Sequence, residues 1–411
     1  MADGKPRFYT LRKHRKKSIF FAAVGAWLVK YGVDRFRDYL TRRQFCEEAK
    51  AYSKEYLHAL QKPRRLMVFF NATAGKGEAE KLFQRNAEPI LHLAGLDVTI
   101  VKTDYEGQIK KLMQYIDPSL DGIVVAGGDG TLLEAVTGLL RRPDQADVSK
   151  IPIGIIPVGT NNTFFNRVFG SGNASQSRQI GNAAMTIVKG QTTSAGVMEI
   201  KGEEGRPTFA LNGVHWGAFR DTAESYDKYW ITGPLRQKMA YIAKTFQGWP
   251  PVSHARISYP INAPSPRHAL SITPSSSPGS LTWRDNAHAM ASTAGATSDG
   301  GTESDGWITR DVETLGLMIE PVMKSLDSMF IRVKIWPQDM AKIDFIRRGW
   351  KMEKRELTSE DESDVDCFAV QELKFVPRDN EESWFSIDGE PFDARTIHIK
   401  YHPDKLIVFS A

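Results

Sequence analysis

Apolar residues follow two different patterns along the chain, and the change falls near residue 192. Before it, runs that are apolar throughout alternate with stretches whose apolar residues recur at helical spacing. This alternation predicts parallel strands that are buried on both faces and separated by helices. The predicted strands are residues 66–71, 97–102, 122–126 and 151–157, and the predicted helices are 79–93, 106–115, 132–140 and 174–189.

Beyond residue 192, short runs alternate between apolar and polar residues, without long helical stretches between them. This pattern is typical of a mostly antiparallel β-domain. The runs are residues 196–201, 207–211, 255–259, 316–319 and 329–336. From about 262 to 306 the chain is rich in Ser, Pro, Ala, Gly and Thr without periodicity, which predicts a disordered insertion.

We therefore expect an α/β plus β fold, in which a doubly wound nucleotide domain is followed by a mostly antiparallel β-domain. An N-terminal membrane-associating helix precedes both. The predicted division is a membrane segment and connector over 1–62, a catalytic domain over 63–191 and a β-rich substrate domain over 192–411. The last strand of the chain can return to the first domain.

Charge adds a feature that the apolar pattern does not give. The net charge is +5, but residues 1–65 carry 17 Lys or Arg against 6 Asp or Glu, so the remainder is acidic. A basic end on an acidic body indicates a membrane surface or a targeting signal, and it argues against nucleic acid as a partner. Two cysteines, Cys46 and Cys367, are too few for a disulfide framework and match no zinc spacing.

The apolar segment 18–33 follows a basic block and includes Phe20, Phe21, Trp27 and Leu28. As a helix it would be about 24 Å long at 1.5 Å per residue. That is shorter than a hydrocarbon core of about 30 Å. We expect this segment to attach the protein to a membrane, either by spanning it with snorkelling flanks or by lying in the interface. A segment that only targets the chain is the alternative.

The most informative stretch is Gly127-Gly128-Asp129-Gly130-Thr131, which joins a buried strand to a helix. Its glycines let a phosphate chain approach main-chain N–H groups, and the N-terminus of the following helix favours the same anion. Asp129 is a carboxylate placed to hold Mg²⁺ or to take a hydroxyl proton. A tight turn without a ligand is the alternative interpretation.

This pentapeptide resembles the signature loop of the diacylglycerol, sphingosine and ceramide kinases, which share a fold with NAD kinase. Residues 92–108, 136–142 and 150–154 are very similar to the mitochondrial acylglycerol kinases of that family. The likeness is strong from about 63 to 250. It implies an NAD-kinase-like nucleotide domain that uses ATP and Mg²⁺ to phosphorylate monoacylglycerol and diacylglycerol. It also implies a place on the mitochondrial inner membrane, facing the intermembrane space.

The resemblance carries over to individual residues. Ala72 stands where the family usually has Pro. Thr163 replaces the usual Asp, so a role that rests on that carboxylate is not expected to carry over. Lys76 can pair with a phosphate or be solvated, and Thr103 can lie near the nucleotide or cap a strand end. The residues implied to bind ATP are Asn71, Gly75, Lys76, Gly77, Thr103, Gly127, Gly128, Gly130, Thr131, Gly159, Thr160 and Asn162.

The turn Asp388-Gly389-Glu390 resembles the Asp-Gly-Glu that closes over the active site from the family's second domain. Asp129, Asp388 and Glu390 are therefore the candidate catalytic residues, and Asp129 is also the candidate metal ligand. Which carboxylate is the base stays open. Asp221 falls where related kinases hold the lipid head group, but an ion pair with Arg220 or Lys228 is an equal alternative.

Three other functions remain compatible with these residues. Ceramide or sphingosine can replace acylglycerol as acceptor. The mitochondrial branch also resembles a subunit of the inner-membrane carrier translocase, and a scaffold would need the body without the chemistry. A soluble nucleotide kinase of the NAD kinase type is disfavoured, since a soluble substrate needs no membrane anchor.

Overall fold

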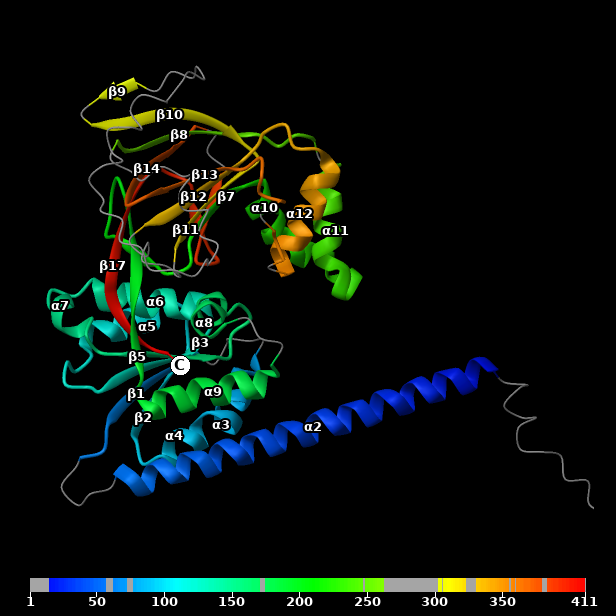
Figure 1. Cartoon of the computed structure of the whole chain (residues 1–411), viewed down its shortest axis with the longest axis vertical. Coiled ribbons are helices and arrows are strands. Elements are labelled where there is room, and N and C mark those ends of the chain that lie inside the picture. Colours follow the sequence, from blue (N-terminus) through cyan, green and yellow to red (C-terminus); the bar gives the residue numbers. More distant parts are fainter. Residues whose placement is uncertain are drawn as a thin grey trace, which may run out of the picture.

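The computed structural model describes residues 15–56, 62–71, 77–170, 174–246, 248–261, 302–304, 306–322, 330–354, 356–358, 360–378 and 383–410. Two domains are stacked one above the other, and a long N-terminal helix lies across the lower one (Figure 1). The disordered insertion predicted at 262–306 lies almost wholly outside the described residues. Gly75 and Lys76, two predicted phosphate-binding residues, also lie outside them.

The first domain is built on parallel strands, as the apolar runs predict. Its strands are β1 (Arg65–Asn71), β2 (Asp97–Thr103), β3 (Gly122–Gly127) and β4 (Ile153–Pro157), and they lie in the order β2-β1-β3-β4. All neighbours in this row pair in parallel. Every residue of β3 and β4 is buried, because helices cover both faces of the sheet. The α/β character of this domain is thereby confirmed.

Alternate strand residues point to the two helical layers. Val68, Phe70 and Val124 share one core with residues of α3 and α4, α9 and the C-terminal half of α2. The strand residues that point the other way, such as Phe69, Ile123 and Val125, pack against the opposite layer of helices. The helices of the first layer are α2 (Arg15–Tyr56), α3 (Ala79–Asn86), α4 (Glu88–Leu93) and α9 (Gln176–Lys189); those of the second are α5 (Gln108–Leu112), η2 (Met113–Tyr115), α6 (Asp129–Leu140), α7 (Gln145–Val148) and α8 (Thr163–Phe169).

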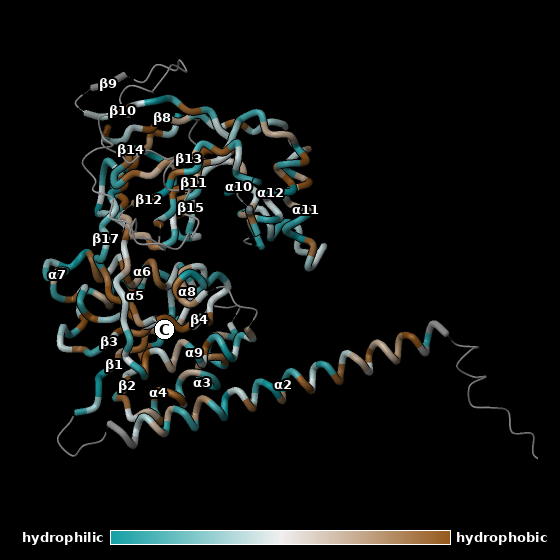
Figure 2. The backbone as a smooth tube through the Cα atoms, viewed as in Figure 1, coloured by the Kyte–Doolittle hydropathy of each residue, from teal (hydrophilic) through white to brown (hydrophobic). Residues whose placement is uncertain are grey.

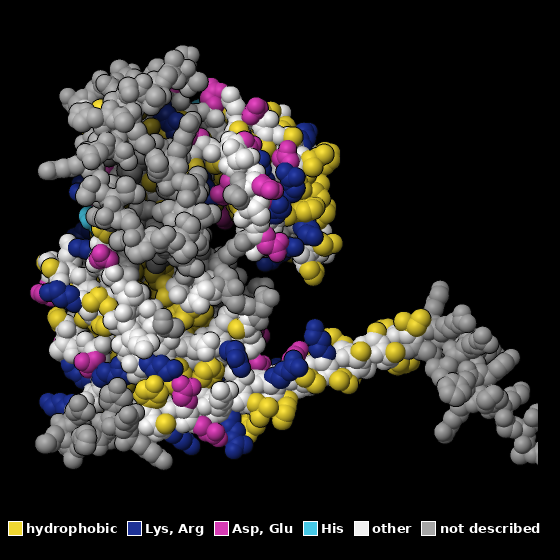
Figure 3. Space-filling model, in the orientation of Figure 1, with side chains coloured by type: hydrophobic (Ala, Val, Ile, Leu, Met, Phe, Trp, Pro, Cys, Tyr) yellow, Lys and Arg dark blue, Asp and Glu magenta, His cyan; other side chains and the backbone are white. Residues whose placement is uncertain are grey.

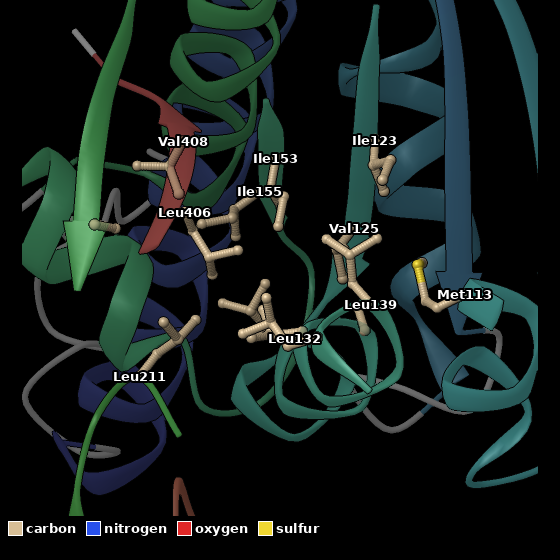
Figure 4. Packing of buried hydrophobic residues seen from close by; sticks show 14 of the residues in the cluster. Met113, Ile123, Val125, Leu132, Leu139, Ile153, Ile155, Leu211, Leu406 and Val408 are labelled. Carbon is tan, nitrogen blue, oxygen red and sulfur yellow. The ribbon is translucent and has the colours of Figure 1, made fainter. Parts of the chain in front are cut away.

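Two long strands, β5 (Thr192–Gly202) and β17 (Ile397–Phe409), connect the domains. They pair antiparallel with one another over most of their length. At its end β17 also pairs in parallel with β4, Val408 opposite Ile153. In Figure 4, Leu406 and Val408 lie beside Ile153 and Ile155 in the core of the first domain. The first sheet therefore continues into the second domain as one eleven-stranded sheet.

The second domain is a sandwich of this continued sheet and a separate six-stranded sheet. Three aromatic side chains meet between the sheets: the ring centroid of Phe375 lies 5.1 Å from that of Trp216 and 5.4 Å from that of Phe385. Its β-rich character is confirmed. The continued sheet adds β6 (Thr208–Ala210), β8 (Ser253–Pro260), β9 (Thr302–Ser304), β10 (Trp307–Thr314) and β14 (Glu372–Pro377); the six-stranded sheet holds β13 (Asp366–Val370), β12 (Ile331–Trp336), β11 (Gly316–Pro321), β7 (Val214–Gly217), β15 (Trp384–Ile387) and β16 (Glu390–Asp393) in that order.

A helical layer on the outer face of the six-stranded sheet was not expected from the sequence. It consists of α10 (Ala218–Glu224), η3 (Ser225–Leu235), α11 (Arg236–Lys244) and α12 (Lys342–Lys354). Helix α10 has only seven residues, and η3 is interrupted by non-helical backbone at Tyr229 and Gly233, so these two elements leave little helical periodicity in the sequence. In the first domain, the predicted helix 79–93 is divided at Ala87, just before Pro89 in the first turn of α4.

Helix α2 is continuous from Arg15 to Tyr56, so the predicted apolar segment and connector form one element. Its C-terminal half packs on α4 and α9, while its N-terminal half projects from the body (Figure 1). Figure 2 shows many hydrophobic residues along this projecting half. Among the described residues, no helix has a stretch long and apolar enough to cross a membrane.

Candidate active site

Two glycine loops lie in direct backbone contact at the carboxyl ends of β3 and β4. The Gly159 N–H donates to the Gly127 carbonyl at 3.2 Å, and the Asp129 N–H donates to the Asn161 carbonyl at 2.9 Å. A Cβ at Gly159 would lie 2.3 Å from the Cα of Gly128. Only glycine permits this approach, and it leaves both loops at the strand ends where such folds bind ligands.

The Asp129 carboxylate is buried and holds the start of the next helix. It accepts hydrogen bonds from the N–H groups of Thr163 at 2.7 Å and Phe164 at 3.0 Å, the first two residues of α8. A carboxylate at a helix N-terminus is favoured by charge and by the unpaired N–H groups there. Asp129 therefore joins the two glycine loops, and each of its oxygens keeps lone pairs for a further partner.

Asp388 follows β15 and is equally well held, from the opposite domain. Its carboxylate accepts the N–H groups of Leu211 and Asn212 at 2.7 Å and of Gly213 at 2.9 Å. The pKa of Asp388 is raised to about 6. Burial is the main cause and the charge of Asp129 adds to it, while the three N–H groups lower the pKa in part. The Asp388 backbone has a positive φ of 51°, which lets the chain reverse into Gly389 and Glu390.

Glu390 extends from this turn across the domain boundary. A Cβ built on Gly130 would lie 1.9 Å from the Glu390 Oε1, so the carboxylate lies against the first turn of α6. Burial raises the pKa of Glu390, and Glu106, Glu134 and Glu224 raise it further. Carboxylates from both domains thus meet at the glycine loop, and the raised pKa of Glu390 suits a proton acceptor.

Arg167 holds the turn at residues 211–212, and no sequence motif singled it out. From α8 it donates to the carbonyl of Leu211 at 2.9 Å and of Asn212 at 3.1 Å. The same turn donates its N–H groups to Asp388. Arg167 therefore fixes the turn that fixes Asp388. Its only signal in the sequence is its position one helical turn after the Asn162-Thr163-Phe164 motif.

The other predicted nucleotide residues have varied settings. The Asn71 amide donates to the Thr131 hydroxyl at 3.4 Å, which joins the first and second glycine loops. The buried Thr103 hydroxyl donates to the Phe70 carbonyl at 3.3 Å, as expected for a strand-terminal hydroxyl. Thr160 is exposed, and Gly77 begins the described chain after the first loop, with a positive φ of 80°.

Asn162 and Asn212 each contain a buried oxygen that lacks a partner among the described residues. The Asn162 amide nitrogen donates to the Gly159 carbonyl at 2.9 Å, but its Oδ1 accepts no described hydrogen bond. An unpaired buried acceptor is costly, so the Asn162 Oδ1, which lies beside the glycine loops, is a candidate to accept from or coordinate a bound group.

Asp221 lies in the first turn of α10 and is exposed. It forms ion pairs with Arg220 at 3.4 Å and with Lys244 at 3.7 Å. The surface ion pair that the sequence left as an alternative is therefore present, with Lys244 in place of Lys228. The Arg220 side chain is buried and that of Asp221 is 45% exposed, so the ion pair leaves Asp221 accessible to an acceptor.

The residues present fit a magnesium ion held jointly with phosphates. Among the described residues there is no cluster of three or more His, Cys, Asp or Glu that could hold a metal alone. Magnesium sites in kinases need only one or two carboxylates, since phosphate and water oxygens complete the octahedron. Asp129 and the unpaired Asn162 Oδ1 are hard oxygen donors of the required kind, and Glu390 lies against the same glycine loop.

Three family models match the chain. Residues 65–200 match the diacylglycerol kinase catalytic domain, and residues 211–411 match the acylglycerol kinase C-terminal model. Residues 12–114 match the inner membrane protein import complex subunit Tim54. The first two matches together cover most of residues 65–411.

Known proteins with similar sequences extend over nearly the full length. Mitochondrial acylglycerol kinase of Mus musculus is 38% identical over 98% of this chain and 96% of its own. The Homo sapiens protein of the same name is 37% identical over the same shares. A diacylglycerol kinase structure from Bacillus anthracis superposes with a TM-score of 0.52 at 18% identity, and it covers 85% of this chain and 97% of its own. At that identity the likeness establishes a diacylglycerol-kinase-like fold alone.

Proposed function

The chain belongs to the acylglycerol kinase family, a family of lipid kinases, and from that premise we propose how its own residues perform the reaction. It uses ATP to phosphorylate the free hydroxyl of monoacylglycerol and diacylglycerol, which gives lysophosphatidic acid and phosphatidic acid. The nucleotide domain, residues 63–191, has the NAD-kinase-like arrangement and binds ATP. Residues 192–411 supply the lipid side of the site.

In this proposal the glycine loops and α6 hold the triphosphate. Main-chain N–H groups of Gly128, Gly130 and Thr131 and the N-terminus of α6 favour phosphate oxygens. Asp129 and the Asn162 Oδ1 would hold Mg²⁺, which neutralises the phosphate charge when bound. In the first loop, Asn71, Gly75, Lys76 and Gly77 would extend the cradle.

Glu390 is the proposed general base. It takes the proton of the lipid hydroxyl as that oxygen bonds to the γ-phosphorus, while the bond from phosphorus to the bridging oxygen breaks and ADP leaves. One observation carries this assignment: the Glu390 carboxylate of the second domain lies against Gly130 of the phosphate loop. Asp129 and Asp388 are less suited to the task because backbone N–H groups already occupy both carboxylates.

The test is Glu390→Gln in the full chain, assayed with labelled ATP and a panel of monoacylglycerol, diacylglycerol, ceramide and sphingosine. We expect kcat to fall about 100-fold or more because a general base typically contributes that much. The KM for ATP should change little, since the lost interaction belongs to the transition state.

Asp393→Asn is the matched control, since Asp393 lies on the same strand and is exposed. It should keep wild-type turnover. If Glu390→Gln retained the wild-type kcat, the assignment of the base would be wrong. If the wild type preferred ceramide or sphingosine in the panel, the acceptor would be wrong while the mechanism could stand.

We further propose that the protein acts at the mitochondrial inner membrane, facing the intermembrane space, and attaches through the apolar half of α2. Phe20, Phe21, Trp27 and Leu28 are all more than half exposed along that half, which supports the attachment. The basic N-terminal segment adds attraction to anionic lipids.

A second function, in protein import, is favoured by the match of residues 12–114 to an import-complex subunit. We propose that α2 and the adjoining part of the first domain assemble with carrier translocase subunits, independently of catalysis. Full-length Glu390→Gln should then restore carrier import to cells that lack the protein. Failure of this variant at normal abundance would contradict the separation of the two functions.

A further inference from the structure

The outer face of the helical layer exposes large apolar side chains. Trp230, Ile231 and Leu235 of η3, Phe246 after α11 and Ile343 of α12, here called the apolar patch, are 53 to 82% exposed. Figure 3 shows hydrophobic side chains gathered along this outer edge. One exposed apolar residue is ordinary, but several on one face indicate a binding surface.

The patch is not left over from incomplete packing. The same helices bury their inner face: Phe219 of α10 lies 5.0 Å from Trp336 of the sheet, and Tyr241 of α11 lies 5.4 Å from Phe345 of α12, between ring centroids. The layer is therefore firmly seated on the six-stranded sheet. Its outer apolar side chains contribute little to the core and are available to a partner.

Charge indicates what kind of partner this is. Residues 218–244 and 342–354 of this layer carry ten Lys or Arg against five Asp or Glu, so the layer is positively charged. Lys228, Lys238, Lys342 and Arg347 are exposed on it, as are the acidic Asp221, Glu224 and Asp227. Apolar side chains with a tryptophan among them, bordered by cations, are the pattern of proteins that dock on anionic membrane surfaces. A surface that binds another protein through its centre is usually depleted in lysine.

The position of the layer points the same way. In Figure 1 the projecting half of α2 and the layer of α10, α11 and α12 extend from the same side of the molecule. Phe20, Phe21 and Trp27 are exposed on that half of α2. One flat bilayer could therefore contact both surfaces at once.

We propose that the apolar patch is a second membrane-contact surface, which docks on anionic phospholipid and sets the site over the acylglycerol. This rests on the proposed function. The helices that carry the patch are connected to the site through the sheet, since η3 follows α10, α10 follows β7, and β7 pairs with β15, the strand that leads into Asp388. Helix α2 tethers the protein to the bilayer, and the patch orients it.

A fluorescent label distinguishes docking from tethering in the full chain. An environment-sensitive dye is attached to the cysteine of the Ile231→Cys variant. The matched control carries the same dye in the Tyr115→Cys variant, because Tyr115 lies on the first domain and is 84% exposed. Burial raises the pKa of the native thiols Cys46 and Cys367, so the introduced thiol reacts first. With phosphatidylcholine vesicles that contain phosphatidylglycerol, the dye at 231 should shift to the blue and be quenched by brominated lipid, and the dye at 115 should not.

Activity gives the second readout. Trp230→Ser with Ile231→Ser should lower turnover of diacylglycerol in vesicles about tenfold, and change turnover of dispersed short-chain monoacylglycerol less than twofold. Tyr115→Ser should leave both unchanged. These side chains are exposed, so the variant is expected to fold.

Each contrary result has a separate meaning. Equal vesicle activity in variant and wild type, with no response of the dye at 231, would overturn the membrane-contact surface and leave the kinase in place. A variant that instead lost self-association in sedimentation would assign the patch to a second copy of the chain. A wild type inactive on every acylglycerol would overturn the proposed function itself.

Discussion

At the scale of single residues, three acidic side chains of the site differ in what surrounds them. Asp129 and Asp388 each accept backbone N–H groups and hold loops in place. Glu390 lies against Gly130; burial raises its pKa, and nearby acidic residues raise it further. Similar carboxylates are thus divided by environment into two that position the site and one suited to move a proton.

Gly159→Ala tests the contact between the glycine loops. The added methyl would lie 2.3 Å from the Cα of Gly128, so one loop must move. We expect kinase activity to be lost and the free energy of unfolding to fall by about 1–3 kcal/mol, as for other overpacked sites.

Gly202→Ala is the control, because its nearest neighbour would be 3.5 Å away, an ordinary contact. Activity and urea unfolding of the two variants can be compared directly. Wild-type activity in Gly159→Ala would show that the loops do not need this approach.

Asp388 predicts a specific dependence of stability on pH. Its folded-state pKa of about 6 lies above the ordinary 3.8, so the folded protein binds this proton more tightly than the unfolded chain. The stability it contributes is therefore present below about pH 4 and is lost as the pH rises through 6, by about 3 kcal/mol.

Asp388→Asn removes this titration. The wild type's free energy of unfolding in urea should exceed that of the variant by less and less as the pH rises from 4 to 7. Exposed Asp393→Asn should show no such change. A constant difference between wild type and Asp388→Asn would contradict the raised pKa.

At the scale of elements, α2 belongs to two environments. A Cβ at Gly181 of α9 would lie 2.4 Å from the Phe45 ring, so the two helices pack in close contact. Lys189 and Glu48 form an ion pair across the same contact at 3.1 Å. The C-terminal half is therefore part of the folded body, while the exposed N-terminal half is free for a membrane or a partner.

Phe45→Ala should loosen this docking without affecting the chemistry. Loss of a partly buried ring lowers the free energy of local opening by about 1.5 kcal/mol, so amides of residues 40–56 should exchange roughly tenfold faster. Phe36→Ala, at an exposed position of the same helix, is the control. Unchanged exchange in Phe45→Ala would mean that other contacts hold the helix.

At the scale of the whole molecule, β17 belongs to both domains. Leu406 lies in the core of the first domain and Ile399 in the core of the second. The strand leaves the two domains with a shared sheet rather than a flexible linker. Placing Glu390 against Gly130 requires that the domains keep one relative position, and this shared sheet provides it.

Leu406→Ala and Ile399→Ala should therefore each destabilise both domains. Each deletes a fully buried side chain, at a cost of about 2–5 kcal/mol. Calorimetry should show one unfolding transition that shifts down in both variants, and Lys400→Ala, exposed on the same strand, should not shift it. Two transitions, only one of them shifted, would show that the domains unfold separately.

The sequence by itself determined the first domain and its glycine loops. Parallel strands buried on both faces are visible as unbroken apolar runs, and a phosphate loop depends on glycines that are adjacent in the chain. Gly127 to Thr131 could be identified for this reason, whereas Gly159 and the turn at Asp388 were identified only through their resemblance to the kinase family. Their place beside one another agrees with the sheet order, although their roles stay predictions.

Only the tertiary structure decided how the carboxylates are held and what faces outward. Asp388 accepts the N–H of Leu211, which lies 177 residues away in the chain, and Arg167 reaches the same turn from α8. No local pattern encodes such contacts. The helical layer was missed because α10 has only seven residues and η3 is interrupted at Tyr229 and Gly233, which is too little for a helical period to be recognised. Periodicity also cannot tell which apolar side chains pack on a sheet and which stay exposed.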